Sequence, residues 1–114
     1  MDEMVELYAY LDDGRQILRM DGTQGFLPDS MTARMLCDRK GGVGADRLLV
    51  FTGTEAVPSF TAYLADGTQE DLTAEDYALL ARAEEDYSVT LTDDFVRRMQ
   101  RASSRDHHET AAVA

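Results

Sequence analysis

The residues best placed to do chemistry lie at the start of a predicted helix. In the stretch "LADGTQEDLTAEDYALLARA", residues 64–83, a strand end and a turn precede a helix that begins at Thr73. Glu75, Asp76 and Tyr77 follow in its first turn. Two neighbouring carboxylates in a pocket can acquire different pKa values and so act as acid and base. We therefore take these three residues as candidate catalytic groups.

The same residues also make a complete helix start. Thr73 is a favourable N-cap, and Asp76 three residues later gives a variant of the capping box. Leu72 and Tyr77 have the spacing of a hydrophobic staple. Glu75 and Asp76 place negative charge at the positive end of the helix, where it is favourable. These two carboxylates would also repel a substrate carboxylate.

Length and charge restrict the classes of function. The chain has 114 residues, 44% of them hydrophobic, and a formal net charge of −11. These values predict one domain with a modest core. The acidic balance argues against nucleic acid and anionic membranes as partners. We find no apolar run of membrane-spanning length, no signal-peptide pattern at the N-terminus, and one cysteine, Cys37. The expected location is the cytoplasm.

Apolar alternation and turn residues outline the first half of the fold. Residues 5–11 alternate as a half-buried strand, and Asp13-Gly14 predicts a hairpin into a second strand. Asp29 or Ser30 caps a helix that ends before a glycine pair, with Cys37 as a small core residue near its end.

The second half gives strands over residues 47–51, 60–64 and 87–91 around the helix at Thr73. Residues 93–100 predict either a short helix or a continued strand. The order ββαββαβ predicts an α+β fold, with an antiparallel sheet wrapped around one or two helices. We expect one domain over residues 1–101.

Residues 102–114, which include His107 and His108, are predicted to be a flexible tail. Two adjacent histidines are weak metal ligands, and we predict no metal site.

The glycine stretch "GGVGAD", residues 41–46, does not predict a phosphate loop. A dinucleotide loop follows a strand and opens a helix, whereas these glycines follow a helix and precede a strand. We interpret them as a helix end with a tight turn.

Two longer segments carry a family resemblance. "LCDRKGGVGADRLLVF" resembles a segment of diaminopimelate epimerases, and "YLADGTQEDLTAEDYALLAR" is similar to a second one further along. The resemblance extends over about residues 5–95. It implies the N-terminal one of that family's two similar half-domains. The implied partner is a second copy, giving a homodimer, or a separate chain that supplies the other half.

The resemblance also implies a chemistry and shows where this chain departs from it. The family inverts an α-carbon without a cofactor, using one cysteine from each half. Here Thr73 stands at the cysteine position, and Ala74-Glu75 replaces a Gly-Asn pair. Leu64 replaces a substrate-binding asparagine, and Glu6 lies near another. These five residues are the candidate ligand pocket, and no cofactor is expected.

The framework of the family segments is retained around these changes: Asp38, Arg39, Gly42, Gly44, Ala45, Asp46, Ala65, Asp66, Gly67 and Arg82.

These observations predict a protein without the thiol site that binds a small molecule or a partner protein. The alternative is a repurposed cofactor-independent isomerase or cyclase of secondary metabolism, with its pocket between two half-domains. Two further alternatives are a component of a genuine lysine-pathway epimerase, working with a second chain, and a vestigial fragment.

Overall fold

The computed structural model describes residues 5–23, 27–54, 56–82 and 84–102. A further helix, called here the C-terminal helix, occupies residues 93–102. The other elements are β1 (Glu6–Asp12), β2 (Arg15–Asp21), α1 (Ser30–Cys37), β3 (Arg47–Phe51), β4 (Phe60–Leu64), β5 (Gln69–Glu70), α2 (Ala74–Leu80) and β6 (Tyr87–Thr90).

The strands form one mixed sheet in the order β5-β4-β3-β2-β1-β6. Neighbouring strands are antiparallel except β2 and β3, which run parallel. The α+β class is therefore confirmed, but the prediction of a wholly antiparallel sheet is wrong. The reason is the connection through α1, because a crossover of this length returns the chain in the same direction.

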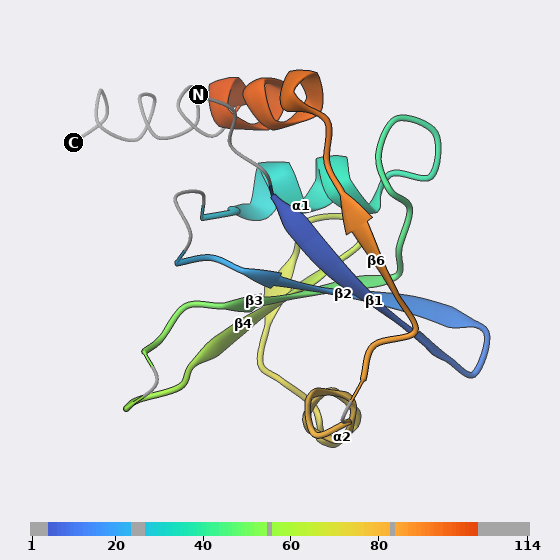
Figure 1. The fold of residues 1–114 in the computed structure, drawn as a ribbon, viewed down its shortest axis with the longest axis vertical. Helices are drawn as coiled ribbons and strands as arrows, with labels where there is room; N and C mark the ends of the chain where they lie inside the picture. The colour runs from blue at the N-terminus through green and yellow to red at the C-terminus, as the bar shows by residue number, and fades with distance from the viewer. Residues whose placement is uncertain (1–4, 24–26, 55, 83, 103–114) are drawn as a thin grey trace.

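Helices cover both faces of the sheet, so the sheet is not wrapped around one or two helices as predicted. Figure 1 shows α1 and the C-terminal helix on one face and α2 alone on the other. The α1 face carries the larger core, which includes Leu7, Leu18, Leu36, Leu48 and Met99. The α2 face carries a smaller core of Tyr10, Ile17, Leu49, Ala62 and Leu79, with Leu72 and Leu80 packed against it.

The hairpin between β1 and β2 confirms its predicted turn. Asp13 and Gly14 both have positive φ, at 50° and 79°. Two consecutive residues in this region make the type I′ turn that suits the twist of a hairpin. The turn fixes the register in which Tyr10 lies opposite Ile17, so both side chains reach the α2 face.

Asp29 is the N-cap of α1, and it forms a capping box with Thr32. Of the two predicted cap residues, Asp29 is therefore confirmed and Ser30 is the first helical residue.

Residues 93–100 are helical, which resolves the two alternatives predicted for them. Phe95, Val96 and Met99 are buried in the larger core, at the spacing of one helix face. Ala102, the first residue of the predicted tail, is still in this helix, and residues 103–114, with His107 and His108, lie outside the described residues.

The glycine segment after α1 folds back onto the end of that helix. The backbone N–H groups of Val43 and Gly44 both donate to the carbonyl oxygen of Leu36, at 2.9 and 3.0 Å. Ala45 N–H donates to the carbonyl of Cys37 at 3.1 Å. The helix-end turn that we predicted is therefore confirmed.

The close approach at Gly42 gives a first prediction. A Cβ atom there would lie 2.0 Å from the carbonyl oxygen of Met35, whereas a Cβ at Gly41 would meet only the Asp38 carboxylate, at 3.2 Å. Gly42→Ala should therefore lower the free energy of unfolding by about 2 kcal/mol or more, because backbone must move. Gly41→Ala should change it by less than about 0.5 kcal/mol. Equal effects in urea denaturation would contradict this account of the loop.

Candidate functional site

The start of α2 is closed by its own side chains. Thr73 has extended backbone angles and is the N-cap, and its Oγ1 accepts a hydrogen bond from Asp76 N–H at 3.2 Å. Asp76 Oδ2 accepts one in return from Thr73 N–H at 2.8 Å. The predicted capping box is confirmed. Two backbone donors that an anion could have used are therefore already bound.

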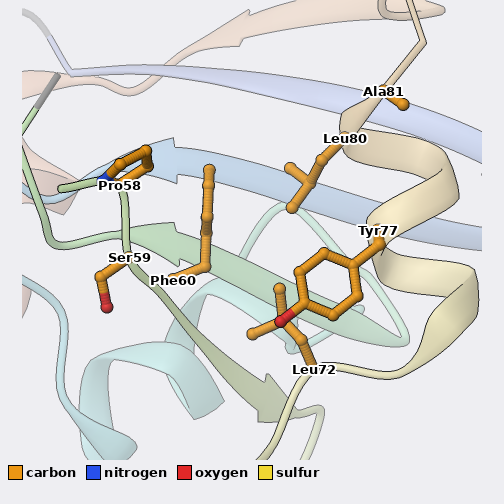
Figure 2. Close-up of a pocket in the computed structure, with 7 residues that line it drawn as sticks. All are labelled: Pro58, Ser59, Phe60, Leu72, Tyr77, Leu80 and Ala81. Atoms are coloured by element: carbon orange, nitrogen blue, oxygen red, sulfur yellow. The ribbon is translucent and has the colours of Figure 1, made fainter. Parts of the chain in front are cut away.

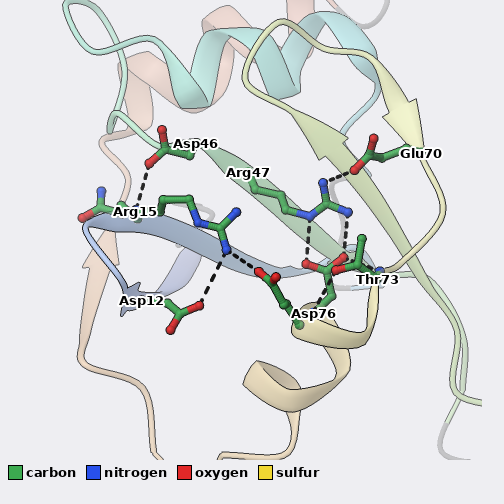
Figure 3. A network of polar contacts seen from close by, with 9 residues as sticks. Asp12, Arg15, Asp46, Arg47, Glu70, Thr73 and Asp76 are labelled. Carbon is green, nitrogen blue, oxygen red and sulfur yellow. Dashed lines mark hydrogen bonds and ion pairs between the residues drawn. The ribbon is translucent and has the colours of Figure 1, made fainter.

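Asp76 also forms a buried ion pair with Arg47, at the first position of β3 (Figure 3). Arg47 Nε donates to Asp76 Oδ1 at 2.8 Å, and Nη2 donates to Oδ2 at 2.7 Å. The two residues are 6% and 2% exposed. Arg47 Nη1 donates to Glu70, and Nη2 lies 3.4 Å from the carbonyl oxygen of Asp71. The carboxylate of Asp76 is thus an anchor between helix and sheet.

The surroundings of Asp76 hold it in the charged form. Burial acts to raise its pKa, but hydrogen bonds from Arg47 and Thr73 and the charge of Arg47 outweigh burial, and the pKa is lowered. The pKa of Arg47 is raised: burial opposes the charged form, and Asp76 and Glu70 outweigh it. A general acid or base near neutral pH needs a pKa near neutrality. Asp76 is therefore poorly suited to the predicted acid/base role.

Glu75 points to a different place from Asp76. Its carboxylate lies 2.7 Å from Arg15 Nη2, and both side chains are exposed. Asp12 lies 3.6 Å from the same nitrogen, and Figure 3 draws this ion pair as a dashed line. Thr73 and Ala74 are also exposed at this end of the helix. The helix start thus carries carboxylates that would repel a substrate carboxylate, as the sequence predicted.

Tyr77 points away from both and lines a surface pocket of about 470 Å³. Figure 2 shows Leu72, Tyr77 and Leu80 on the α2 side of it, facing Pro58 and Phe60. Ser59 and Ala81 complete the lining. Among the described residues no charged side chain lines it; its polar side-chain groups are the hydroxyls of Ser59 and Tyr77. This is an apolar site of the volume that small ligands occupy.

The structure separates the other candidate pocket residues. Leu64, half-buried at the end of β4, lies opposite Arg47 in the sheet, near the start of α2. Glu6 is exposed at the far end of β1. Because β1 lies three strands from β4, Glu6 and Leu64 are about 14 Å apart across the sheet. They are also roughly 13 Å apart along the strands, because Glu6 is four residues from Tyr10, the β1 residue in register with Leu64. The five residues do not line one pocket.

Several of the framework residues that the resemblance predicts stabilise turns around the sheet. Asp46 accepts hydrogen bonds from Gln16 N–H and Arg39 Nη2, each at 2.9 Å. Arg82 pairs with Asp86 at 3.2 Å. At Gly67, with φ of 91°, a Cβ would lie 2.5 Å from the carbonyl oxygen of Ser30. These contacts are structural, and none of these residues lines the pocket in Figure 2.

Cys37 is buried in the larger core, as predicted. Burial first, and the charge of Asp46 second, raise the pKa of its thiol to about 11. A thiol with this pKa is almost wholly protonated at neutral pH and is a weak nucleophile.

Arg47 and the pocket are the features that the sequence did not predict. The strand over residues 47–51 is otherwise apolar, so the arginine at its first position was the signal in the sequence that could have indicated a buried ion pair. In the described residues, no group of three or more His, Cys, Asp or Glu side chains gathers as a metal site. None of the helices in the described ranges is both long and apolar enough to cross a membrane.

No protein-family model matches the chain, and no curated protein matches its sequence.

The ion pair gives a second prediction, with a matched control next to it. Asp76→Ala should lower the free energy of unfolding by about 3 kcal/mol or more, since it strips the buried Arg47 of its main partner. Glu75→Ala removes an exposed pair and should cost less than about 1 kcal/mol. Chemical denaturation of both variants measures the difference. Similar losses in the two would show that the buried pair does not anchor α2.

The lowered pKa of Asp76 makes its contribution depend on pH. A carboxylate with a folded pKa below its unfolded value stabilises fully above the unfolded pKa and loses its effect as pH falls through the folded pKa. The stability gap between wild type and Asp76→Asn should therefore be constant from about pH 7 to 5 and shrink below about pH 4. The pKa values of Asp66 and Asp86 are also lowered, but both residues are common to the two proteins. A gap that stays constant to pH 2.5 would contradict the prediction.

Proposed function

We propose that this chain is a small-molecule-binding domain that resembles a diaminopimelate-epimerase half-domain but carries no epimerase chemistry at the start of α2. The support for this proposal is a difference between the start of α2, which is closed by its own side chains, and its next turn, which faces a pocket. At its start, Thr73, Asp76 and Arg47 satisfy one another, and Glu75 adds further negative charge. One turn later, Tyr77 and Leu80 line an open pocket.

The pocket's chemistry selects an apolar ligand body. Phe60 and Tyr77 offer aromatic rings, and Leu72 and Leu80 offer aliphatic contacts. Burial of an apolar ligand on such a surface contributes roughly 25 cal/mol per Å² before the cost of association. Ser59 and Tyr77 can each make one orienting hydrogen bond. Binding, rather than proton transfer, is the activity that these groups support.

A fluorescence titration tests the binding site. N-phenyl-1-naphthylamine, an uncharged dye, should bind saturably to the wild-type protein. Ala81→Phe places a ring in the pocket. Because this ring occupies space that the dye would fill, the dye's affinity should fall about tenfold. Tyr87→Ala is the control, because it removes a tyrosine that does not line the pocket and should leave the affinity unchanged. Absence of saturable binding, or equal affinities in all three proteins, would refute the proposed site.

A second measurement addresses the lost chemistry. Diaminopimelate in deuterated buffer should keep its α-hydrogen, by NMR, in the presence of the purified protein. Exchange that depends on the protein and stops in Thr73→Val would contradict the proposal. The second half-domain or homodimer implied by the resemblance stays a prediction, so the exchange assay is repeated at high protein concentration.

A further inference from the structure

An arginine on the same face of the sheet as the pocket has no anionic partner among the residues that the structure describes. Arg19 in β2 lies opposite Leu49 in β3, and Leu49 lies opposite Ala62 in β4. Leu49 and Ala62 belong to the core under α2. Because residues in register share a face of the sheet, Arg19 projects on the α2 side.

The guanidinium of Arg19 is held by aromatic rings instead of carboxylates. Its Cζ lies 4.8 Å from the centre of the Tyr8 ring and 5.9 Å from that of Tyr10. The residue is half-buried. Within the described ranges it has no ion pair and no side-chain hydrogen bond. In a chain with 22 acidic and 11 basic residues, a half-buried cation without a carboxylate is unusual.

The end of α2 connects this cation to the pocket. Ala81 lines the pocket, and the next residue, Arg82, places its Cζ 5.3 Å from the centre of the Tyr10 ring that Arg19 also faces. Phe60, on the other side of the pocket, lies on β4, two strands away from Arg19 on β2. It is two residues from Ala62, the β4 residue in register with Arg19. Phe60 therefore lies about 10 Å across the sheet and roughly 7 Å along it from Arg19. A small amphipathic molecule spans such a distance.

We infer that the ligand of this pocket is a monocarboxylate with an apolar body, whose carboxylate binds the guanidinium of Arg19. This inference rests on the proposed function and names the class of molecule bound. The apolar body lies among Phe60, Leu72 and Leu80, and the carboxylate extends across the sheet toward Arg19 on β2. The N–H groups of a guanidinium form a planar fork that matches a carboxylate.

Charge on this face limits the ligand to one negative group. Asp21, two residues from Arg19 on the same face, accepts hydrogen bonds from Thr23 N–H and Oγ1 at 2.9 and 2.6 Å. Glu6 is exposed on the neighbouring strand. Arg82 is already paired with Asp86. A dianion or a phosphate ester would be repelled by these carboxylates, and Arg19 adds a single positive charge to offset them, so a monoanion fits best.

A matched pair of ligands tests the inference. 2-Naphthoate and 2-naphthamide share one ring system and differ in charge, and each can displace the uncharged dye. The wild type should bind the naphthoate at least about tenfold more tightly than the naphthamide, and 0.5 M salt should reduce that ratio. Arg19→Gln should bring the ratio close to one while the naphthamide affinity is unchanged. Arg97→Gln, an exposed arginine on the C-terminal helix, removes the same charge on the other face and should leave the ratio as in the wild type.

The outcomes separate this inference from the proposed function. If the naphthamide binds but the wild type shows no preference for the naphthoate, or if Arg19→Gln keeps the preference, the carboxylate site is refuted and the pocket stands. Loss of the preference in Arg97→Gln as well would assign it to net charge and also refute the site. If neither the dye nor the naphthamide binds, the proposed function itself fails. The naphthamide affinity of Arg19→Gln checks that the variant's pocket is folded.

Discussion

The buried ion pair between Arg47 and Asp76 determines where α2 lies on the sheet. Two charges buried at this depth are favourable only with near-ideal geometry and further hydrogen bonds. Here the pair is bidentate, Glu70 adds a second carboxylate, and Thr73 donates its backbone N–H. Because these bonds are directional, they fix both the position and the rotation of the helix. Tyr77 and Leu80 reach the pocket only in that orientation.

The pocket exists because α2 is too short to cover its face of the sheet. Seven residues of helix extend about 10 Å, whereas six strands extend about 24 Å from edge to edge. The opposite face carries two helices and the larger core. On the α2 face, Tyr8, Arg19, Phe51 and Phe60 are left half-buried. Their aromatic rings and the Arg19 guanidinium are among the groups that this face offers to a ligand.

Local signals predicted the helix starts and the turns, because their determinants are within a few residues. Thr73 and Asp76 form their box over three residues, and Asp13-Gly14 makes its own turn. The anchor of the site was not predictable in this way. Arg47 and Asp76 are 29 residues apart, and only the sheet brings them together. The parallel pairing of β2 and β3 likewise depends on where α1 packs, and the two-residue β5 is too short to show alternation.

The ion pair also bears on whether thiol chemistry is possible at the start of α2. The resemblance predicted from the sequence implies a cysteine at the position of Thr73. A thiol placed there in this protein would lie beside the carboxylate of Asp76, held in its charged form by Arg47. A neighbouring negative charge raises the pKa of a thiol and lowers the fraction of reactive thiolate. The residue that anchors the helix is thus the one that opposes thiolate formation. If the predicted resemblance holds, a single change of Thr73 to cysteine would not supply a reactive thiolate, because the helix anchor itself opposes one.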